Sequence, residues 1–182
     1  MDLAKTYPAN ELPTRPFVGL FGNHNNNWRK WVKKVLERNG IGENQVYDST
    51  QDGWKVINDE NGDAMQRWID ELVARQHEAM KAASCLIFSM DSRTRTWDLS
   101  NLSASASVPA PSEEGGNILA TRCELGWLAG IKKRTFVWVP DDLQGRNYLR
   151  AVIKLYPILV PVDNLYTACI LVKSHLGKDG KK

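Results

Sequence analysis

A glutamate in the middle of a helical segment is the residue of this sequence whose position best suits chemistry. Glu124 lies nearly two turns inside a predicted helix that follows the glycines Gly115 and Gly116. Most of its neighbours three and four positions away are small or apolar: Ala120, Thr121, Trp127 and Leu128. A carboxylate in such surroundings is costly to desolvate, so we expect it to have a use. The alternative is a partly exposed glutamate that pairs with Lys132 or an arginine.

Short apolar segments that alternate with helical segments must position this glutamate. The predicted strands cover residues 17–22, 46–48, 85–90, 135–139 and 158–162, and the predicted helices cover 28–38, 63–83, 118–130, 148–155 and 165–176. Strands that are apolar throughout are typical of a parallel sheet covered on both faces. The sequence therefore predicts an α/β fold, a doubly wound five-stranded parallel sheet of flavodoxin- or Rossmann-like type.

Composition and charge describe one ordinary domain. The chain has 182 residues, 42% of them hydrophobic and 25% charged, which predicts a packed core. We expect a polar leader over residues 1–15, a single domain over 16–177 and a basic tail over 178–182. The net charge is +3, and the lysines beyond residue 172 account for the excess. The near-neutral remainder argues against the clustered basic face that binds a nucleic-acid polymer.

Cysteines, histidines and apolar segments exclude further classes of protein. Three widely spaced cysteines, Cys85, Cys123 and Cys169, are expected to be reduced core residues. No pair of the three histidines has the spacing of metal ligands, and we expect neither a metal nor a cofactor. No long apolar segment or secretory leader is visible, which predicts a cytoplasmic protein without a membrane partner.

Polar residues that follow the predicted strands are the next candidates. In a doubly wound sheet, ligands bind outside the carboxyl ends of the strands. Gly22 and Asn23 follow the first strand, Asp48 ends the second, and Asp91 follows the third. The alternatives are simple turn residues and, for Asp91, a solvated turn aspartate. Gln76 occupies a place on the apolar stripe of the longest helix, so we expect its side chain to point inward.

The segment Glu124-Leu125-Gly126 resembles the signature of the nucleoside 2-deoxyribosyltransferase family. It lies in a helix entered from a glycine-containing loop and is followed by Ala129-Gly130 and Lys132-Lys133. Further pieces of the family pattern occur in the same order, over about residues 16–176: Phe21-Gly22, Asn27-Trp28-Arg29, Gln76, Leu86 to Phe88, and Pro140 to Asp142. The resemblance implies the same fold and a homodimer or higher homo-oligomer.

The resemblance also implies a reaction. Glu124 would attack C1′ of a nucleoside or nucleotide and form a covalent glycosyl-enzyme, which a second free base or water then resolves. Asp91 is the candidate that handles the base or its proton. Gln76 occupies the position of an acidic residue in the family; it can orient a sugar or base but cannot act as a general acid. Gly22 and Asn23 would approach the sugar with backbone and amide groups.

The connection over residues 92–116 contributes the remaining candidates. It is rich in serine and proline, and its length of about 25 residues exceeds what a structural connection needs. Folded over a ligand, it would stack Trp97 on a base and bring Arg93 and Arg95 to a phosphate; the alternative is a flexible solvated loop. Asn117 is expected either to hold a sugar hydroxyl or to cap the helix.

The sequence is also compatible with two functions other than transfer of the sugar to a second base. One is an N-glycosidase, or an NAD-cleaving relative, that uses Glu124 with water as the acceptor. The other is a non-catalytic nucleotide-binding module, because Gly19, Gly22 and Asp48 are faintly similar to a dinucleotide site. The full glycine fingerprint of such sites is absent, since Gly19-Leu20-Phe21-Gly22 supplies only two of its glycines.

Overall fold

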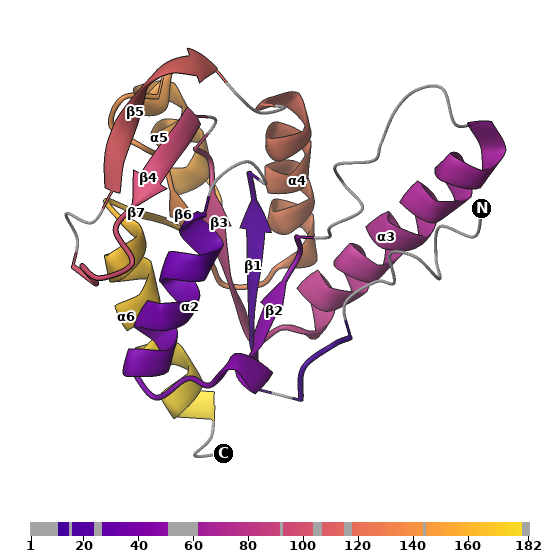
Figure 1. Cartoon of the computed structure of the whole chain (residues 1–182). Helices are drawn as coiled ribbons and strands as arrows, with labels where there is room; N and C mark the ends of the chain where they lie inside the picture. The colour runs from indigo at the N-terminus through magenta and orange to yellow at the C-terminus, as the bar shows by residue number, and fades with distance from the viewer. Residues whose placement is uncertain are drawn as a thin grey trace.

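A five-stranded parallel sheet lies at the centre of the molecule (Figure 1). The computed structural model describes residues 11–14, 16–23, 27–50, 62–91, 93–103, 107–114, 118–143 and 145–179. The strand order is β2-β1-β3-β6-β7. These strands are β1 (Val18–Gly22), β2 (Val46–Asp48), β3 (Cys85–Ser89), β6 (Thr135–Trp138) and β7 (Leu159–Val162). The order, with the first strand inside and later strands added on one side, is that of a doubly wound sheet.

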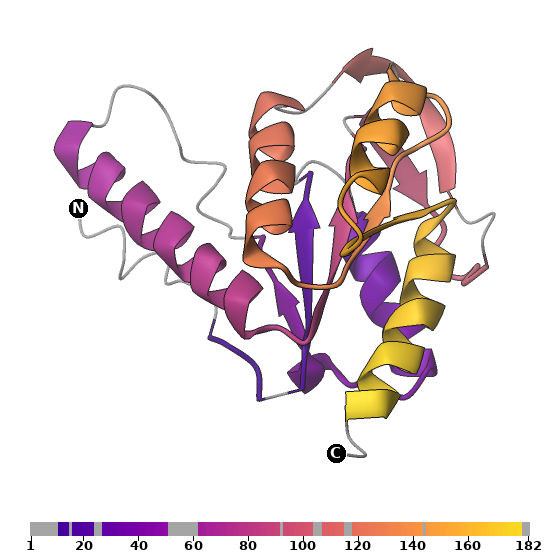
Figure 2. The same ribbon diagram turned by 180° about the vertical axis from the view of Figure 1, so that it is seen from behind.

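Helices cover both faces of the sheet, which confirms the predicted fold class. They are α2 (Trp28–Arg38), α3 (Gly62–Ala82), α4 (Ile118–Ile131), α5 (Arg146–Lys154) and α6 (Leu165–Asp179). Apolar side chains of α2 and α6 pack into one core cluster, and those of α3, α4 and α5 pack into a second. Helices α2 and α6 lie to one side of β1 in both views, and α4 lies to its other side (Figures 1 and 2).

Alternation along β3 shows why a continuously apolar strand suits this place. Cys85 and Ile87 join the core under α2 and α6, while Leu86 and Phe88 join the core under α3 and α4. Successive side chains of a strand point to opposite faces, so both faces of a central strand must be apolar. Cys85 and Cys169 are buried; the side chain of Cys123 lies outside the described part.

The long serine- and proline-rich connection contains a second, smaller sheet. Strands β4 (Arg93–Trp97) and β5 (Ser107–Glu114) pair antiparallel, near the carboxyl ends of the large sheet (Figure 1). The flexible-loop alternative for this segment is therefore wrong over these residues. The pair is anchored to the core at Trp97, whose ring centroid lies 5.0 Å from that of Trp31. Within the described part of the chain, no helix is both long and apolar enough to cross a membrane.

Candidate functional site

Strands β1 and β3 end level with each other, and their ends form the floor of the candidate site. The parallel register places Gly22 opposite Ser89. Gly22 has a φ of +103°, and a Cβ atom added there would lie 2.2 Å from the Ser89 carbonyl oxygen. The next backbone amide, that of Asn23, donates to the same oxygen at 3.2 Å. A side chain at position 22 would be excluded twice, by the backbone dihedral and by the contact, so this turn requires glycine.

Glu124 reaches this turn from α4, which runs beside β1 (Figures 1 and 2). The Gly22 N–H donates a hydrogen bond to its carboxyl group. Its Oε2 atom is buried and has no hydrogen-bond partner among the described residues. Burial raises the pKa of Glu124 to about 7, against the opposing effects of the Arg29 charge and the Gly22 N–H. Glu124 as a whole is half-buried, its Oε2 atom is buried, and the charge acting on it comes from Arg29, so features of both expectations for this residue are present.

Arg29 is a site residue that the sequence analysis named only within the segment Asn27-Trp28-Arg29 and gave no role. Its side chain is buried, with the residue only 3% exposed. Nη2 donates to the Gly22 carbonyl at 2.8 Å and Nη1 to the Asn23 carbonyl at 2.5 Å. Nη2 also lies 3.3 Å from the Ser49 hydroxyl. One guanidinium therefore joins the ends of β1 and β2, and desolvation lowers its pKa to about 10 although Asp48 and Glu124 oppose that shift.

Asp48, expected near a sugar, holds the two cationic side chains of α2. Its Oδ1 lies 3.2 Å from Arg29 Nε, and its Oδ2 lies 2.7 Å from Lys33 Nζ. The Thr50 backbone N–H donates to Oδ1 at 2.9 Å. Burial favours the neutral acid, but Arg29, Lys33 and Thr50 together hold the pKa of Asp48 below its usual value. These contacts make Asp48 a support for Arg29, and its contact with a substrate stays a prediction.

Asp91 and Asn23 lie together in the interior of the site. Asp91 is 1% exposed, so the solvated-turn alternative for this residue is wrong. The Asn23 side-chain amide donates to the Asp91 backbone carbonyl. Asn23 is itself held from α2, because the Trp28 indole N–H donates to its carbonyl oxygen at 2.9 Å. The residues that follow β1 and β3 thus converge as expected for the carboxyl edge of a doubly wound sheet.

Gln76 points inward from α3, as predicted from its place on the apolar stripe. It is 4% exposed, and its Nε2 donates to the Ser49 backbone carbonyl at 3.2 Å. Ser49 therefore has contacts from two helices, through its carbonyl to Gln76 and through its hydroxyl to Arg29. The amide of Gln76 borders the same strand ends as the other candidates but adds no ionisable group.

Trp97 is not brought to the site as a stacking surface. Its ring is buried between Trp31 and Trp138, with centroids 5.0 Å and 5.7 Å away. The expectation that Trp97 stacks on a base is corrected to a packing role, because tryptophan rings of the core already contact it. Asn117 lies outside the described residues, as do the side chains of Arg93 and Arg95.

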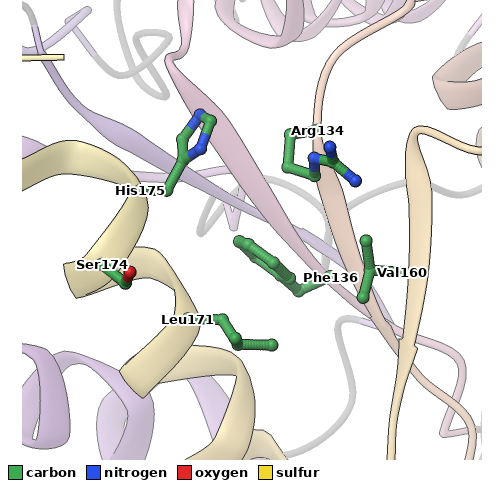
Figure 3. A pocket seen from close by; sticks show the side chains of 6 residues that line it. All are labelled: Arg134, Phe136, Val160, Leu171, Ser174 and His175. Carbon is green, nitrogen blue, oxygen red and sulfur yellow. The ribbon is translucent and has the colours of Figure 1, made fainter. Parts of the chain in front are cut away.

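A separate hollow of about 270 Å³ lies at the opposite end of the sheet (Figure 3). Its apolar walls come from β6, β7 and α6, and its polar rim includes Arg134, directly before β6. It is lined by Arg134, Phe136, Val160, Leu171, Ser174 and His175. It therefore shares no residue with the candidate site. Among the described residues, no three His, Cys, Asp or Glu side chains gather as a metal site would need.

Comparison of the chain with models of protein families, with curated proteins and with solved structures gives no match.

Proposed function

We propose that this protein breaks the N-glycosidic bond of a nucleoside or nucleotide and transfers the sugar, with Glu124 as the nucleophile. The observation that carries the proposal is the Glu124 carboxyl group itself. Glu124 is half-buried at the carboxyl edge of the sheet, its carboxyl group accepts a hydrogen bond from Gly22, and its buried Oε2 atom has no hydrogen-bond partner among the described residues. A buried carboxyl oxygen left without a donor is costly, and such groups concentrate where a ligand or a reaction uses them.

The first step forms a glycosyl ester. The ionised Glu124 attacks C1′ through Oε2, and the bond between C1′ and the base nitrogen breaks. The base leaves with the electron pair of that bond and takes up a proton, which we propose is relayed through the carboxyl group of Asp91. The transition state carries positive charge on the sugar ring, which a nearby carboxylate stabilises.

The second step releases the sugar. A nitrogen of a second free base attacks C1′, the ester bond to Glu124 breaks, and the carboxylate is restored; the proton of the incoming nitrogen passes to Asp91. With water as the acceptor the same step gives a free sugar. The two displacements retain the configuration at C1′, as in retaining glycosidases.

The test is base exchange. The protein is incubated with a panel of nucleosides and nucleotides, with and without a second free base, and the products are separated by chromatography. An exchanged nucleoside is expected; free sugar alone would place the activity with the N-glycosidases. Mass spectrometry of the quenched protein should find a sugar on the peptide that contains Glu124.

Two variants make this test specific. Glu124→Gln should abolish both base release and the adduct. Glu78→Gln is the matched control, because Glu78 is an exposed glutamate on α3 that pairs with Arg75 at 3.2 Å. Ligand binding without turnover in the wild-type protein would contradict the proposal and favour the nucleotide-binding module.

A further inference from the structure

We infer that Arg29 is the positioning residue of this site: its guanidinium fixes the turn at Gly22 and Asn23, and through that turn it sets how the Glu124 carboxyl is held. The kinetic part of this inference rests on the proposed function. Its structural part concerns only the chain, and it is tested on Glu124 directly.

Arg29 contacts two consecutive carbonyl groups of the turn. Nη2 binds the Gly22 oxygen at 2.8 Å and Nη1 binds the Asn23 oxygen at 2.5 Å. Charge-assisted hydrogen bonds from a planar fork fix direction as well as distance. Gly22 has a φ of +103°, outside the range that other residues readily adopt, so its backbone needs such a restraint to stay in one conformation.

The same turn contacts the proposed nucleophile. The N–H of the same Gly22 donates to the Glu124 carboxyl. The N–H and carbonyl groups of Gly22 are separated only by its Cα atom, and Arg29 holds the carbonyl. The direction of the N–H therefore depends on the hydrogen bonds from Arg29. Arg29 also acts on Glu124 through its charge. Both effects favour the ionised carboxyl in one orientation.

The guanidinium nitrogens of Arg29 are already engaged by groups of the protein. Two nitrogens of Arg29 donate hydrogen bonds, Nη1 to Asn23 and Nη2 to Gly22 and Ser49, and Nε forms an ion pair with Asp48 at 3.2 Å without hydrogen-bond geometry. The guanidinium carbon also lies 4.5 Å from the centre of the Trp28 ring. A side chain committed in this way suits a positioning role better than direct binding of a substrate phosphate.

The charged groups around Glu124 define the expected effect. From α2, Arg29 faces it; from β1, the Gly22 N–H faces it; from β2, Asp48 acts on Arg29. Lys33 shares Asp48 with Arg29 but touches neither carbonyl of the turn. Arg29→Met therefore removes the hydrogen bonds to the Gly22 and Asn23 carbonyls together with the positive charge. Lys33→Met removes a cation that binds the same aspartate and leaves the turn intact.

The experiment titrates Glu124 by carboxyl ¹³C NMR, with its resonance assigned from Glu124→Gln. In Arg29→Met the midpoint should rise by at least about one pH unit, whereas in Lys33→Met it should stay at the wild-type value. In the activity assay, the acidic limb of the pH profile of kcat/KM should move by the same amount. An unmoved midpoint in folded Arg29→Met overturns the inference.

A conservative variant covers the case in which Arg29→Met does not fold. Arg29→Lys keeps the charge but cannot grip both carbonyls, so the Gly22 amide resonance should shift and kcat should fall about tenfold or more with little change in KM. An unmoved Gly22 resonance overturns the inference. A moved midpoint in a protein without glycosidic activity would refute the proposed function and leave the positioning role standing.

Discussion

Arg29 and Glu124 come from different helices on opposite faces of the sheet, yet they act on the same glycine. Arg29 binds the carbonyl oxygen of Gly22, and Glu124 accepts a hydrogen bond from its N–H. The end of β1 therefore links helices on the two faces of the sheet, through hydrogen bonds at Gly22 and through the charge interaction between Arg29 and Glu124. The predictions below follow from this arrangement and from the cores that hold it.

Activity should depend on the ionisation of Glu124. The proposed nucleophile would act as a carboxylate, and burial raises the pKa of Glu124 to about 7. We expect kcat/KM to increase about tenfold per pH unit below that value and to level off above it. The measurement is the pH profile of kcat/KM between pH 5 and 9. A profile already level at pH 5 would show that Glu124 is not the titrating nucleophile.

Glu124→Gln should stabilise the protein at alkaline pH. The folded-state pKa is raised from 4.5 to about 7, so the folded state holds a proton that the unfolded state has lost between those values. Stability contributed by the neutral acid is present below the unfolded pKa and is lost as the pH rises through 7. The amide mimics the neutral acid at every pH.

The gain should appear in urea unfolding at pH 8 as about 1–3 kcal/mol and should vanish near pH 4. An equal effect of Glu124→Gln at both pH values would contradict the burial of this carboxyl as the cause.

Gly22→Ala should destabilise the protein by more than about 2 kcal/mol. The new Cβ would meet the Ser89 carbonyl oxygen at 2.2 Å while the backbone stays at a φ of +103°. Gly40→Ala is the matched control, because Gly40 has a φ of +84° but no atom within 4 Å of the added carbon. Its cost should be only about 1 kcal/mol. Equal costs in denaturant unfolding would argue against the close approach of β1 and β3.

Trp97→Ala should cost about 3–5 kcal/mol, because the ring is buried between Trp31 and Trp138. Trp127→Ala removes the same ring from a position that is 42% exposed and should cost far less. Trp97→Phe should leave KM for a nucleoside unchanged. A rise in KM with little loss of stability would restore the base-stacking role.

Order and type of the large-sheet elements were predictable because the strands are apolar throughout and the helices carry clear stripes. The same stripe indicated that Gln76 points inward, and the carboxyl-edge rule grouped Gly22, Asn23 and Asp91. Arg29 was missed because an arginine in the first turn of a helix is usually solvated. The available signal was its place beside Trp28, at the start of the helix that follows the first strand.

The small sheet escaped prediction for a different reason. Strand β5 has the sequence SVPAPSEE, in which two prolines remove backbone donors and no apolar alternation is visible. Prolines are tolerated in edge strands, where one side of the backbone needs no partner. Pairing with β4, together with the packing of Trp97, outweighs the local preference of these residues, and neither contact can be read from the segment alone.

The level ends of β1 and β3 tie the site to the integrity of the whole sheet. If β1 slipped by one residue, Gly22 would leave its place opposite Ser89, and Val18 and Leu20 would turn to the wrong face. The geometry of the candidate site therefore depends on the register of the central strand pair. In hydrogen exchange, the Asn23 amide, which donates to the Ser89 carbonyl, should be released together with the amides of β3.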